Sequence, residues 1–215
     1  MEKKEKDALK SALKRKEFIN HGFALFVRKS IDAVTLQEVA DSAGYGIATL
    51  YRYFGTKQDF VIAVSASKWE QVFESYRRPC QDMASEGERA VDIFSHYLTS
   101  FIEIYKNHKD LLYFNQMFNI YIKAENVEYN VIQPYQEVIQ ILEDRFHRMY
   151  LRAQDDHSLR TDIPEKEMFS ATLHLMLAAV TRYAVGLVYD AGIDPEKELR
   201  LLKDMLMKEY TLPQD

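Results

Sequence analysis

An all-α fold is the class that this sequence predicts, and three observations support it. Of the 215 residues, only seven are Gly and five are Pro. Hydrophobic residues make up 47% of the chain, and they recur at the spacing of helices rather than of strands. This composition is typical of long helices with short connections, and the length accommodates one domain or two unequal ones.

The N-terminal part of the chain is basic although the whole chain is acidic. The formal net charge is −5, yet residues 1–60 contain eleven Lys and Arg against eight Asp and Glu, while the remainder contains seventeen against twenty-five. Apolar residues recur between Leu9 and Lys29 among charged ones, which predicts an amphipathic helix with a basic outer face. That face either approaches phosphate groups or is simply solvated.

The next segment predicts a short capped helix. Thr35 and Glu38 have the spacing of a capping box, and Val34 and Val39 have that of the accompanying hydrophobic staple. Gly44 ends the segment. The residues that share its narrow apolar face are Leu36, Val39, Ala40 and Ala43.

A second short helix is predicted over residues 47–54. Leu50 and Phe54 are expected to face inward, so the opposite side of this helix faces outward. Together with the glycine turn, the two short helices form a helix-turn-helix pattern. The residues expected on the outer side are Ile47, Ala48, Tyr51 and Arg52.

The next helix along the chain is predicted to begin at Lys57, capped by Thr56 with Asp59 at the box position. A cation at a helix N-terminus opposes the macrodipole by about 0.3–1 kcal/mol, whereas a phosphate there is stabilised. Lys57 therefore favours a nucleic-acid phosphate as its partner. This helix is expected to run to the neighbourhood of Pro79. It would join a helix-turn-helix DNA-binding domain, residues 1–55, to a helical effector-binding and dimerisation domain, residues 56–215.

Further helices bring the predicted total to about nine. Proline at the first turn marks two of them, at Pro164 and Pro195, and Ser85 is the expected cap of another. Their expected ranges are 86–107, 110–124, 134–153, 164–190 and 195–210.

Residues 18–60 resemble the N-terminal domain of the TetR/AcrR family of transcriptional regulators. The most specific run extends from Thr49 to Lys57, through Leu50, Tyr51, Tyr53 and Phe54. The resemblance implies a three-helix DNA-binding head whose third helix enters the major groove, carried on a larger helical domain that binds a small molecule and dimerises. It also implies a repressor that binds palindromic operator DNA as a homodimer and is released by an effector. The residues themselves indicate neither the effector nor the direction of regulation.

The family motif assigns DNA-contacting roles by position. Gln37 can pair with adenine, and an apolar side chain can meet a thymine methyl group, whereas hydroxyl, ammonium and amide groups suit phosphates. Tyr51 and Tyr53 have an alternative interpretation as half-buried aromatics that brace the head. The implied phosphate contacts are Thr35, Tyr51, Tyr53, Lys57 and the Gly46 amide, and the implied base contacts are Gln37, Ile47, Ala48 and Thr49.

Three positions depart from the family pattern. Gly46 stands where serine is common, so only its amide can bind a phosphate. Ser30 replaces a usual glycine after the first helix. Gly22 replaces a usual alanine inside that helix, at a cost of about 1 kcal/mol unless close helix packing requires it.

Aromatic residues concentrate in the second part of the chain. Twelve Phe and Tyr residues lie from Phe94 to Tyr150. They predict either a ring-lined ligand pocket or ordinary core packing. The candidates for ligand contact are Tyr97, Phe101, Phe114, Phe118, Tyr121 and His174.

The last two predicted helices favour a two-fold interface. Small residues such as Ala178 and Ala179 permit close helix approach, and leucines follow in the last helix. Pairing there would space two recognition helices by whole DNA turns of about 34–36 Å. The candidate interface residues are Ala178, Arg182, Leu199, Leu202, Met205 and Leu206.

Enzyme classes fit the sequence poorly. Asp144 and His147 have the spacing of half a helical metal-carboxylate site, but no second pair completes it. Cys80 has no histidine nearby, and the chain lacks a nucleophile elbow and a phosphate-binding glycine loop. We therefore expect no catalytic residue, metal or cofactor. The other alternative is a helical sensor that kept the head as a scaffold and does not bind DNA.

The sequence also predicts the compartment. The N-terminus lacks the apolar stretch of a secretory signal, and a single cysteine cannot form an intramolecular disulfide. No uninterrupted apolar run approaches the roughly 20 residues that cross a bilayer. We expect a cytoplasmic protein without a membrane partner.

Overall fold

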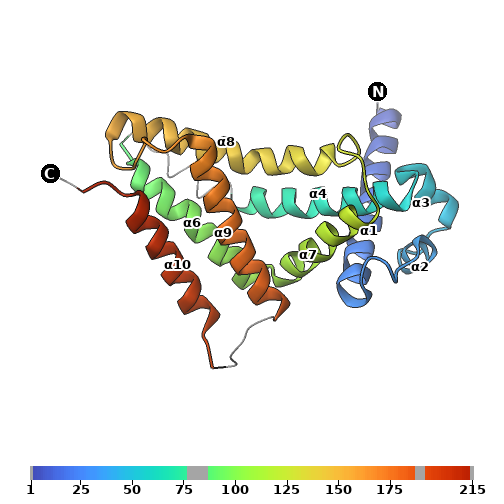
Figure 1. Cartoon of the computed structure of the whole chain (residues 1–215). Helices are drawn as coiled ribbons and strands as arrows, with labels where there is room; N and C mark the ends of the chain where they lie inside the picture. The colour runs from blue at the N-terminus through green and yellow to red at the C-terminus, as the bar shows by residue number, and fades with distance from the viewer. Residues whose placement is uncertain (1, 77–86, 187–191, 214–215) are drawn as a thin grey trace. The chain divides into compact units, whose positions relative to one another are not determined.

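The computed structural model describes residues 2–76, 87–186 and 192–213, and this part of the chain is all-α, as predicted. It contains no strand, only an isolated bridge between Leu159 and Thr211. Figure 1 shows the order of its helices, which are α1 (Glu2–Lys29), α2 (Leu36–Ser42), α3 (Ile47–Phe54), α4 (Lys57–Ser75), α6 (Ala90–Asn107), α7 (Lys109–Ala124), α8 (Gln133–Asp156), α9 (Glu165–Val185) and α10 (Pro195–Tyr210).

The chain divides into two compact units. The first, which we call the head unit, comprises Met1–Trp69 and Phe114–Glu137. The second, the body unit, comprises Glu70–Tyr113 and Val138–Asp215. The helices α4, α7 and α8 each contribute residues to both units, so the compact head contains more than the helix-turn-helix.

Aromatic rings fill the core of the head unit. Phe18 and Phe26 on α1 are fully or almost fully buried, and Phe60 on α4 is fully buried between neighbouring rings. The Phe60 ring centroid lies 4.8 Å from that of Phe54 and 5.8 Å from that of Phe26. Ring packing of this kind stabilises the contact beyond the area that it buries. It fixes α3 and α4 on α1.

The first helix is longer than predicted and is apolar on its core side over only part of its length. It begins at Glu2 rather than near Leu9. Leu9 and Leu13 are 62% and 53% exposed, so the prediction that they belong to a buried face is wrong. The buried core face starts at Phe18, and before that turn the helix meets α3 through polar contacts such as the hydrogen bond from Ser11 to Tyr53.

The body unit is built on α6, α9 and α10, which pack against one another. Phe94 on α6, Met176 on α9 and Leu199 on α10 are completely buried. The Asp156 carboxylate accepts from the Ala90 amide at 2.7 Å, so the end of α8 caps the start of α6. The three apolar faces together form the core of this unit.

Several helix ends differ from the predicted ones. The helix α6 begins at Ala90 with Arg89 as its N-cap, and Ser85 lies outside the described residues. Pro164 is the N-cap of α9 rather than its first residue, and α9 ends at Val185, where Gly186 adopts a left-handed cap with φ 79°. A glycine in that conformation ends a helix at little steric cost. Pro195 begins α10, as predicted.

Candidate nucleic-acid interface and ligand pocket

The predicted capping box at the start of α2 is confirmed. The Thr35 hydroxyl oxygen accepts from the Glu38 amide at 3.2 Å, and the Glu38 carboxylate accepts from the Thr35 amide at 2.9 Å. Lys29 donates to the same carboxylate at 2.8 Å. These hydrogen bonds, led by that of Lys29, lower the pKa of Glu38 to about 2. The box therefore holds a charged carboxylate and orients the first turn of α2.

The turn between α2 and α3 is fixed to α1 by a residue that sequence reasoning did not single out. The Tyr45 hydroxyl donates to Glu17 at 2.5 Å, and the Tyr45 ring lies 5.2 Å from that of Phe18. His21 and Ser42 make a second link from α1 to α2, at 2.8 Å. No local pattern reveals these contacts, because their partners are 21 and 28 residues apart in the chain.

The helix α3 has the inner and outer faces that the sequence predicts. Leu50 is fully buried and Phe54 is 5% exposed. On the opposite side Tyr51 is 50% exposed, and Ala48 and Arg52 are also exposed. Ile47 and Thr49 are half-buried at the edges of this face. The outer face therefore combines small apolar groups with a phenol and a guanidinium.

Tyr53 differs from Tyr51 in its surroundings. It is half-buried, its ring centroid lies 5.9 Å from that of Phe18, and its hydroxyl accepts from Ser11 at 3.1 Å. The Arg52 guanidinium lies 5.9 Å from the Tyr53 ring. Tyr53 thus braces α3 against α1, which corresponds to the alternative interpretation of this residue.

The start of α4 is held by its own capping box. The Thr56 amide donates to Asp59 at 3.1 Å, and the Asp59 amide donates to the Thr56 hydroxyl oxygen at 3.1 Å. The Lys57 ammonium donates to the Asp32 carbonyl oxygen at 3.3 Å. This carbonyl oxygen offsets part of the unfavourable position of a cation at the helix N-terminus. It also leaves Lys57 next to the loop that leads into α2.

Gln37 is placed on the exposed side of α2. Its amide nitrogen donates to Asp41 one turn later, at 2.7 Å. The amide nitrogen has a second N–H group, so a base contact does not require the bond to Asp41 to break. Thr35 is exposed at the start of the same helix, and Gly46 is exposed at the N-cap of α3 without a side-chain cap.

Comparison with known proteins identifies this arrangement. Residues 18–64 match the sequence model of the bacterial regulatory proteins of the tetR family. A putative TetR-family transcriptional regulator from Mesorhizobium loti superposes with a TM-score of 0.71 at 15% identity, over 94% of this chain and 98% of that one. This is the fold of a TetR-family regulator. The resemblance inferred from residues 18–60 is confirmed.

Other TetR-like structures agree with this assignment. The transcriptional regulator FadR from Bacillus subtilis, solved in complex with stearoyl-CoA, superposes with a TM-score of 0.70 at 14% identity, over 89% of this chain and 97% of that one. The ketosteroid regulator KstR2 of Mycobacterium tuberculosis gives 0.63 at 14% identity, over 93% and 95%. No curated protein matches the sequence significantly. The likeness to TetR regulators thus lies in the helix-turn-helix sequence and in the fold.

The six residues predicted to contact a ligand fall in both units. Tyr97 and Phe101 lie in the body core, with ring centroids 5.5 Å apart, and Tyr97 is 7% exposed. Burial raises the pKa of the Tyr97 hydroxyl, whose oxygen has no hydrogen-bond partner. Phe114, Phe118 and Tyr121 lie in the core of the head unit. His174 is exposed on α9 and lies 3.4 Å from the Ser170 hydroxyl.

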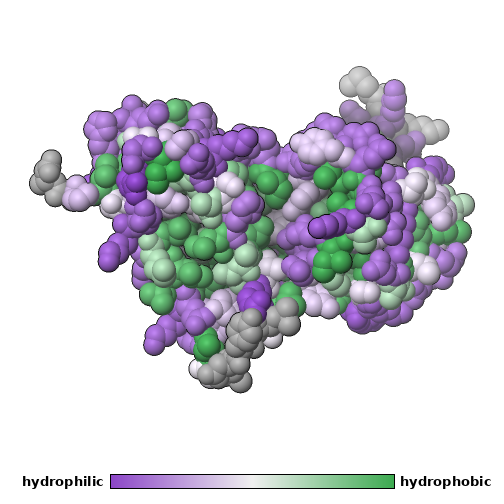
Figure 2. Space-filling view, in the orientation of Figure 1, coloured by the Kyte–Doolittle hydropathy of each residue, from purple (hydrophilic) through white to green (hydrophobic). Residues whose placement is uncertain are grey.

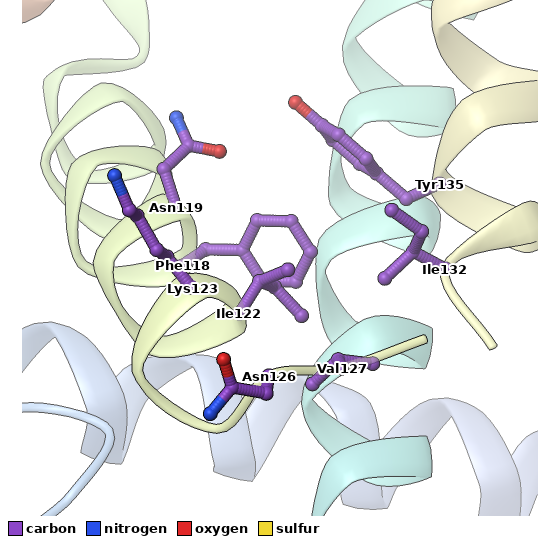
Figure 3. Close-up of a pocket in the computed structure, with 8 residues that line it drawn as sticks. All are labelled: Phe118, Asn119, Ile122, Lys123, Asn126, Val127, Ile132 and Tyr135. Atoms are coloured by element: carbon purple, nitrogen blue, oxygen red, sulfur yellow. The ribbon is translucent and has the colours of Figure 1, made fainter. Parts of the chain in front are cut away.

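A pocket of about 350 Å³ lies within the head unit, where α7 ends and α8 begins. Of the residues predicted to bind a ligand, only Phe118 lines it. Nothing in the sequence pattern pointed to the others, because a helix end, a loop and a helix start meet there only in the folded chain. Figure 3 shows the lining residues, which are Phe118, Asn119, Ile122, Lys123, Asn126, Val127, Ile132 and Tyr135.

The candidate interface residues differ in their exposure. Met205 is 57% exposed, and Ala178 and Arg182 are also exposed. Leu199 is completely buried and Leu206 is 9% exposed, because α10 packs these side chains into the body core. Neither leucine is therefore available on the surface of one chain. Hydrophobic side chains nevertheless gather over α9 and α10 (Figure 2), and the exposed ones include Leu175, Leu201 and Met205.

The residues of the metal-site alternative make other contacts. The His147 ring nitrogen Nδ1 lies 3.0 Å from both carboxylate oxygens of Glu165. Gln140 donates to Asp144 at 3.5 Å. In the described ranges no group of three or more His, Cys, Asp or Glu side chains could hold a metal ion. Cys80 lies outside these ranges.

Proposed function

We propose that the chain is a transcriptional regulator that binds operator DNA through α3 and the start of α4. The main support is the exposed side of α3, where Ala48, Tyr51 and Arg52 face outward. Leu50 and Phe54 are buried on the opposite side of the helix. The capping boxes of α2 and α4 fix the two helix starts beside this surface. Helix-start amides and hydroxyl groups bind phosphates, while small apolar side chains approach base edges.

Within this proposal the predicted contacts have two roles. Thr35, Tyr51, Lys57 and the Gly46 amide bind phosphates, and Arg52 joins them as an exposed cation. Gln37, Ile47, Ala48 and Thr49 approach the bases. Tyr53 contributes mainly by bracing α3, because its hydroxyl already binds Ser11 and its ring packs on α1.

The chain acts as a homodimer in this proposal, with α9 and α10 at the interface. The apolar side chains of Leu175, Leu201 and Met205 are 44%, 59% and 57% exposed. By length and composition α9 is also apolar enough to cross a membrane, and only 28% of its most apolar stretch is buried within the chain. A helix that packs against a second copy can have the same length and composition, and two-fold pairing suits a palindromic operator. We therefore assign α9 to an interface of a cytoplasmic protein.

A small-molecule effector regulates DNA binding in this proposal. TetR-like neighbours include a FadR solved with stearoyl-CoA and a ketosteroid regulator. An effector that prefers a conformation with wrongly spaced heads weakens DNA binding by its differential affinity for the two states. We propose repression as the direction, with the effector releasing the DNA.

Selection from a random duplex library tests DNA binding directly. The full-length protein is expected to enrich a palindromic sequence, and mobility shift with that sequence is expected to be salt-sensitive. If the chain is a regulator, its dimer is expected to bind this sequence selectively. If no sequence is enriched and only weak, unselective binding remains at moderate salt, the chain is instead a helical sensor that kept the head as a scaffold.

Point variants separate the two contact roles. Lys57→Ala and Tyr51→Phe are expected to weaken all DNA sequences nearly alike, and Lys57→Ala is expected to lower the salt slope by about 1. Gln37→Ala and Ile47→Ala are expected to change the preferred sequence, at a cost of about 1–3 kcal/mol on the original operator. Lys166→Gln, an exposed charge change on α9, is the control. Uniform effects from all four variants would contradict this division of roles.

The dimer has its own test. Met205→Glu places a charge on the exposed apolar side of α10 and is expected to produce monomers in sedimentation velocity. Ile120→Glu is the matched control, because Ile120 is 59% exposed and lies on α7, which is not one of the two helices of the proposed interface. A dimer that survives Met205→Glu and Leu201→Glu together would place the interface elsewhere.

A further inference from the structure

We propose that the pocket in the head unit is a binding site for a small carboxylate with an aromatic or similarly flat apolar body. Nothing in the family motif assigns this site. The inference rests on the proposed function, since it names a ligand class and a route by which that ligand acts on DNA binding. At about 350 Å³ the pocket is at the small end of the range for small-molecule sites, about 300–1,000 Å³.

The inner wall of the pocket is apolar. In Figure 3 the Phe118 ring lies at its centre, with Ile122 beside it and with Val127 and Ile132 opposite. The Tyr135 ring is 4.9 Å from that of Phe118, centroid to centroid, with an angle of 58° between the planes. Two rings at this angle and three branched side chains suit a flat hydrocarbon body.

Two of the polar lining residues, Asn119 and Lys123, lie on one side of this wall, whereas the Asn126 amide and the Tyr135 hydroxyl lie elsewhere around it (Figure 3). Asn119 and Lys123 are one turn apart on α7, both are exposed, and both side chains extend to the same side of the Phe118 ring in Figure 3. Among the described residues no carboxylate lies within ion-pair distance of the Lys123 ammonium. An ammonium beside an amide suits a carboxylate, because a charge-assisted hydrogen bond is about twice as strong as a neutral one.

Ring contacts connect this pocket with α3. Phe118 lies 6.2 Å from Phe114, and Phe114 stacks on Phe26 of α1 at 6.0 Å. Phe26 in turn lies 5.8 Å from Phe60 of α4, which lies 4.8 Å from Phe54 of α3. All these rings belong to the head unit. A close-packed core transmits displacement because it has little free volume to absorb it.

A second connection leads to α4. Gln58, directly after Lys57, donates to Glu125 at 3.4 Å. Glu125 precedes Asn126, a lining residue with φ 49°, in the left-handed region. A ligand between α7 and α8 therefore acts on the loop that holds Gln58. Its occupancy biases the start of α4, where Lys57 lies.

The chain contains a built-in reporter for this site. Its single tryptophan, Trp69, donates to the Asn115 side-chain oxygen at 3.1 Å. The Tyr135 hydroxyl donates to the same oxygen at 3.4 Å. Because Tyr135 lines the pocket, a ligand that moves it changes the surroundings of Trp69.

Titration with hydrocinnamate tests binding without DNA. Calorimetry and Trp69 fluorescence of the full-length protein are expected to show saturable binding, and the neutral hydrocinnamamide is expected to bind about tenfold more weakly. Lys123→Gln is expected to remove this difference, while the control Lys166→Gln keeps it. The proposal is overturned if hydrocinnamate does not bind, if the amide binds equally well, or if Lys123→Gln leaves the preference intact.

A pocket-filling variant tests the coupling. Ile122→Trp is expected to abolish hydrocinnamate binding while the circular dichroism spectrum is retained. Because the larger side chain fills the pocket as the ligand does, this variant is expected to shift the DNA affinity in the same direction as hydrocinnamate shifts that of the wild type. Hydrocinnamate is expected to change the DNA affinity of the wild type by roughly 5- to 150-fold and that of Ile122→Trp not at all. Binding without any effect on DNA would overturn the coupling. If the wild type binds hydrocinnamate but does not bind DNA even without the ligand, the proposed function is overturned and the ligand site stands.

Discussion

The ring of Phe60 on α4 occupies the space that a Cβ atom on Gly22 would need. An added Cβ would lie 2.6 Å from Phe60 Cε1 and closer still to Cζ. Phe60 is itself fully buried against Phe26 and Phe54, so its ring has no room to retreat. The departure of Gly22 from the family pattern therefore has a packing reason. The glycine lets α4 approach α1 closely.

Gly22→Ala is expected to destabilise the protein, although alanine is the better helix former. Overpacking a close-packed core costs about 1–3 kcal/mol, which exceeds or offsets the gain in helix propensity of about 1 kcal/mol. Urea unfolding followed by circular dichroism measures the difference. Adding Phe60→Leu in the same chain is expected to recover part of the loss, because the smaller side chain vacates the space. If Gly22→Ala alone stabilised the protein, the Phe60 ring would be able to move away from the added methyl group without cost.

Ser30→Gly is expected to stabilise the head. Ser30 has φ 76°, in the left-handed region, directly after α1. The left-handed conformation costs a residue with a Cβ atom about 1–2 kcal/mol. Glycine avoids this cost but loses more backbone entropy on folding, which offsets part of the gain. A net gain of up to about 1 kcal/mol is expected in thermal unfolding. Ser30→Ala serves as the control, since it removes the hydroxyl and keeps the Cβ; an equal gain from alanine would assign the effect to the hydroxyl.

Glu38 is expected to make stability depend on pH in the acid range. Its pKa is about 2 in the folded chain against an ordinary 4.5, chiefly because Lys29 donates to it. The stabilisation is therefore fully present above about pH 4.5 and is lost as the pH falls towards 2. The contribution is small because the pair is exposed and screened by solvent. Glu38→Gln is expected to flatten this part of the stability curve in urea unfolding, whereas the exposed control Glu5→Gln leaves it unchanged.

Gly46→Ser is expected to strengthen DNA binding. Gly46 is the N-cap of α3 with φ −72°, and nothing lies within 4 Å of an added Cβ, so serine fits without strain. Its hydroxyl caps α3, which adds a few tenths of a kcal/mol to stability. The same hydroxyl reaches a phosphate and tightens binding to all sequences alike in mobility shift. A gain confined to the preferred operator would instead indicate a base contact.

Asn115→Leu is expected to destabilise the head through unsatisfied donors. Asn115 is 1% exposed and its oxygen accepts from both Trp69 and Tyr135. A buried donor without a partner costs about 1–3 kcal/mol. Gln116→Leu, an exposed change on the same helix, is the control, and circular dichroism follows unfolding because Trp69 belongs to the network. Equal stability of the two variants would show that solvent replaces the lost acceptor.

Local signals predicted much of the head correctly. The capping boxes at Thr35 and Thr56 and the inward side of Leu50 and Phe54 depend on spacings of three or four residues, which the sequence displays directly. The helix α10 was predicted with both of its bounds. The family resemblance lies in the same short segment, so fold class and helix-turn-helix follow from neighbouring residues alone.

Tertiary packing decided the rest. Leu9 and Leu13 are apolar and helical yet exposed, while Leu199 and Leu206 are buried, although the members of each pair share one face of their helix. Gly22 became understandable only beside Phe60, and the pocket exists only because α7, its loop and α8 meet around Phe118. A helix repeats every few residues, so the sequence shows which side is apolar. Which other helix covers that side depends on contacts between residues far apart in the chain, and no local pattern encodes them.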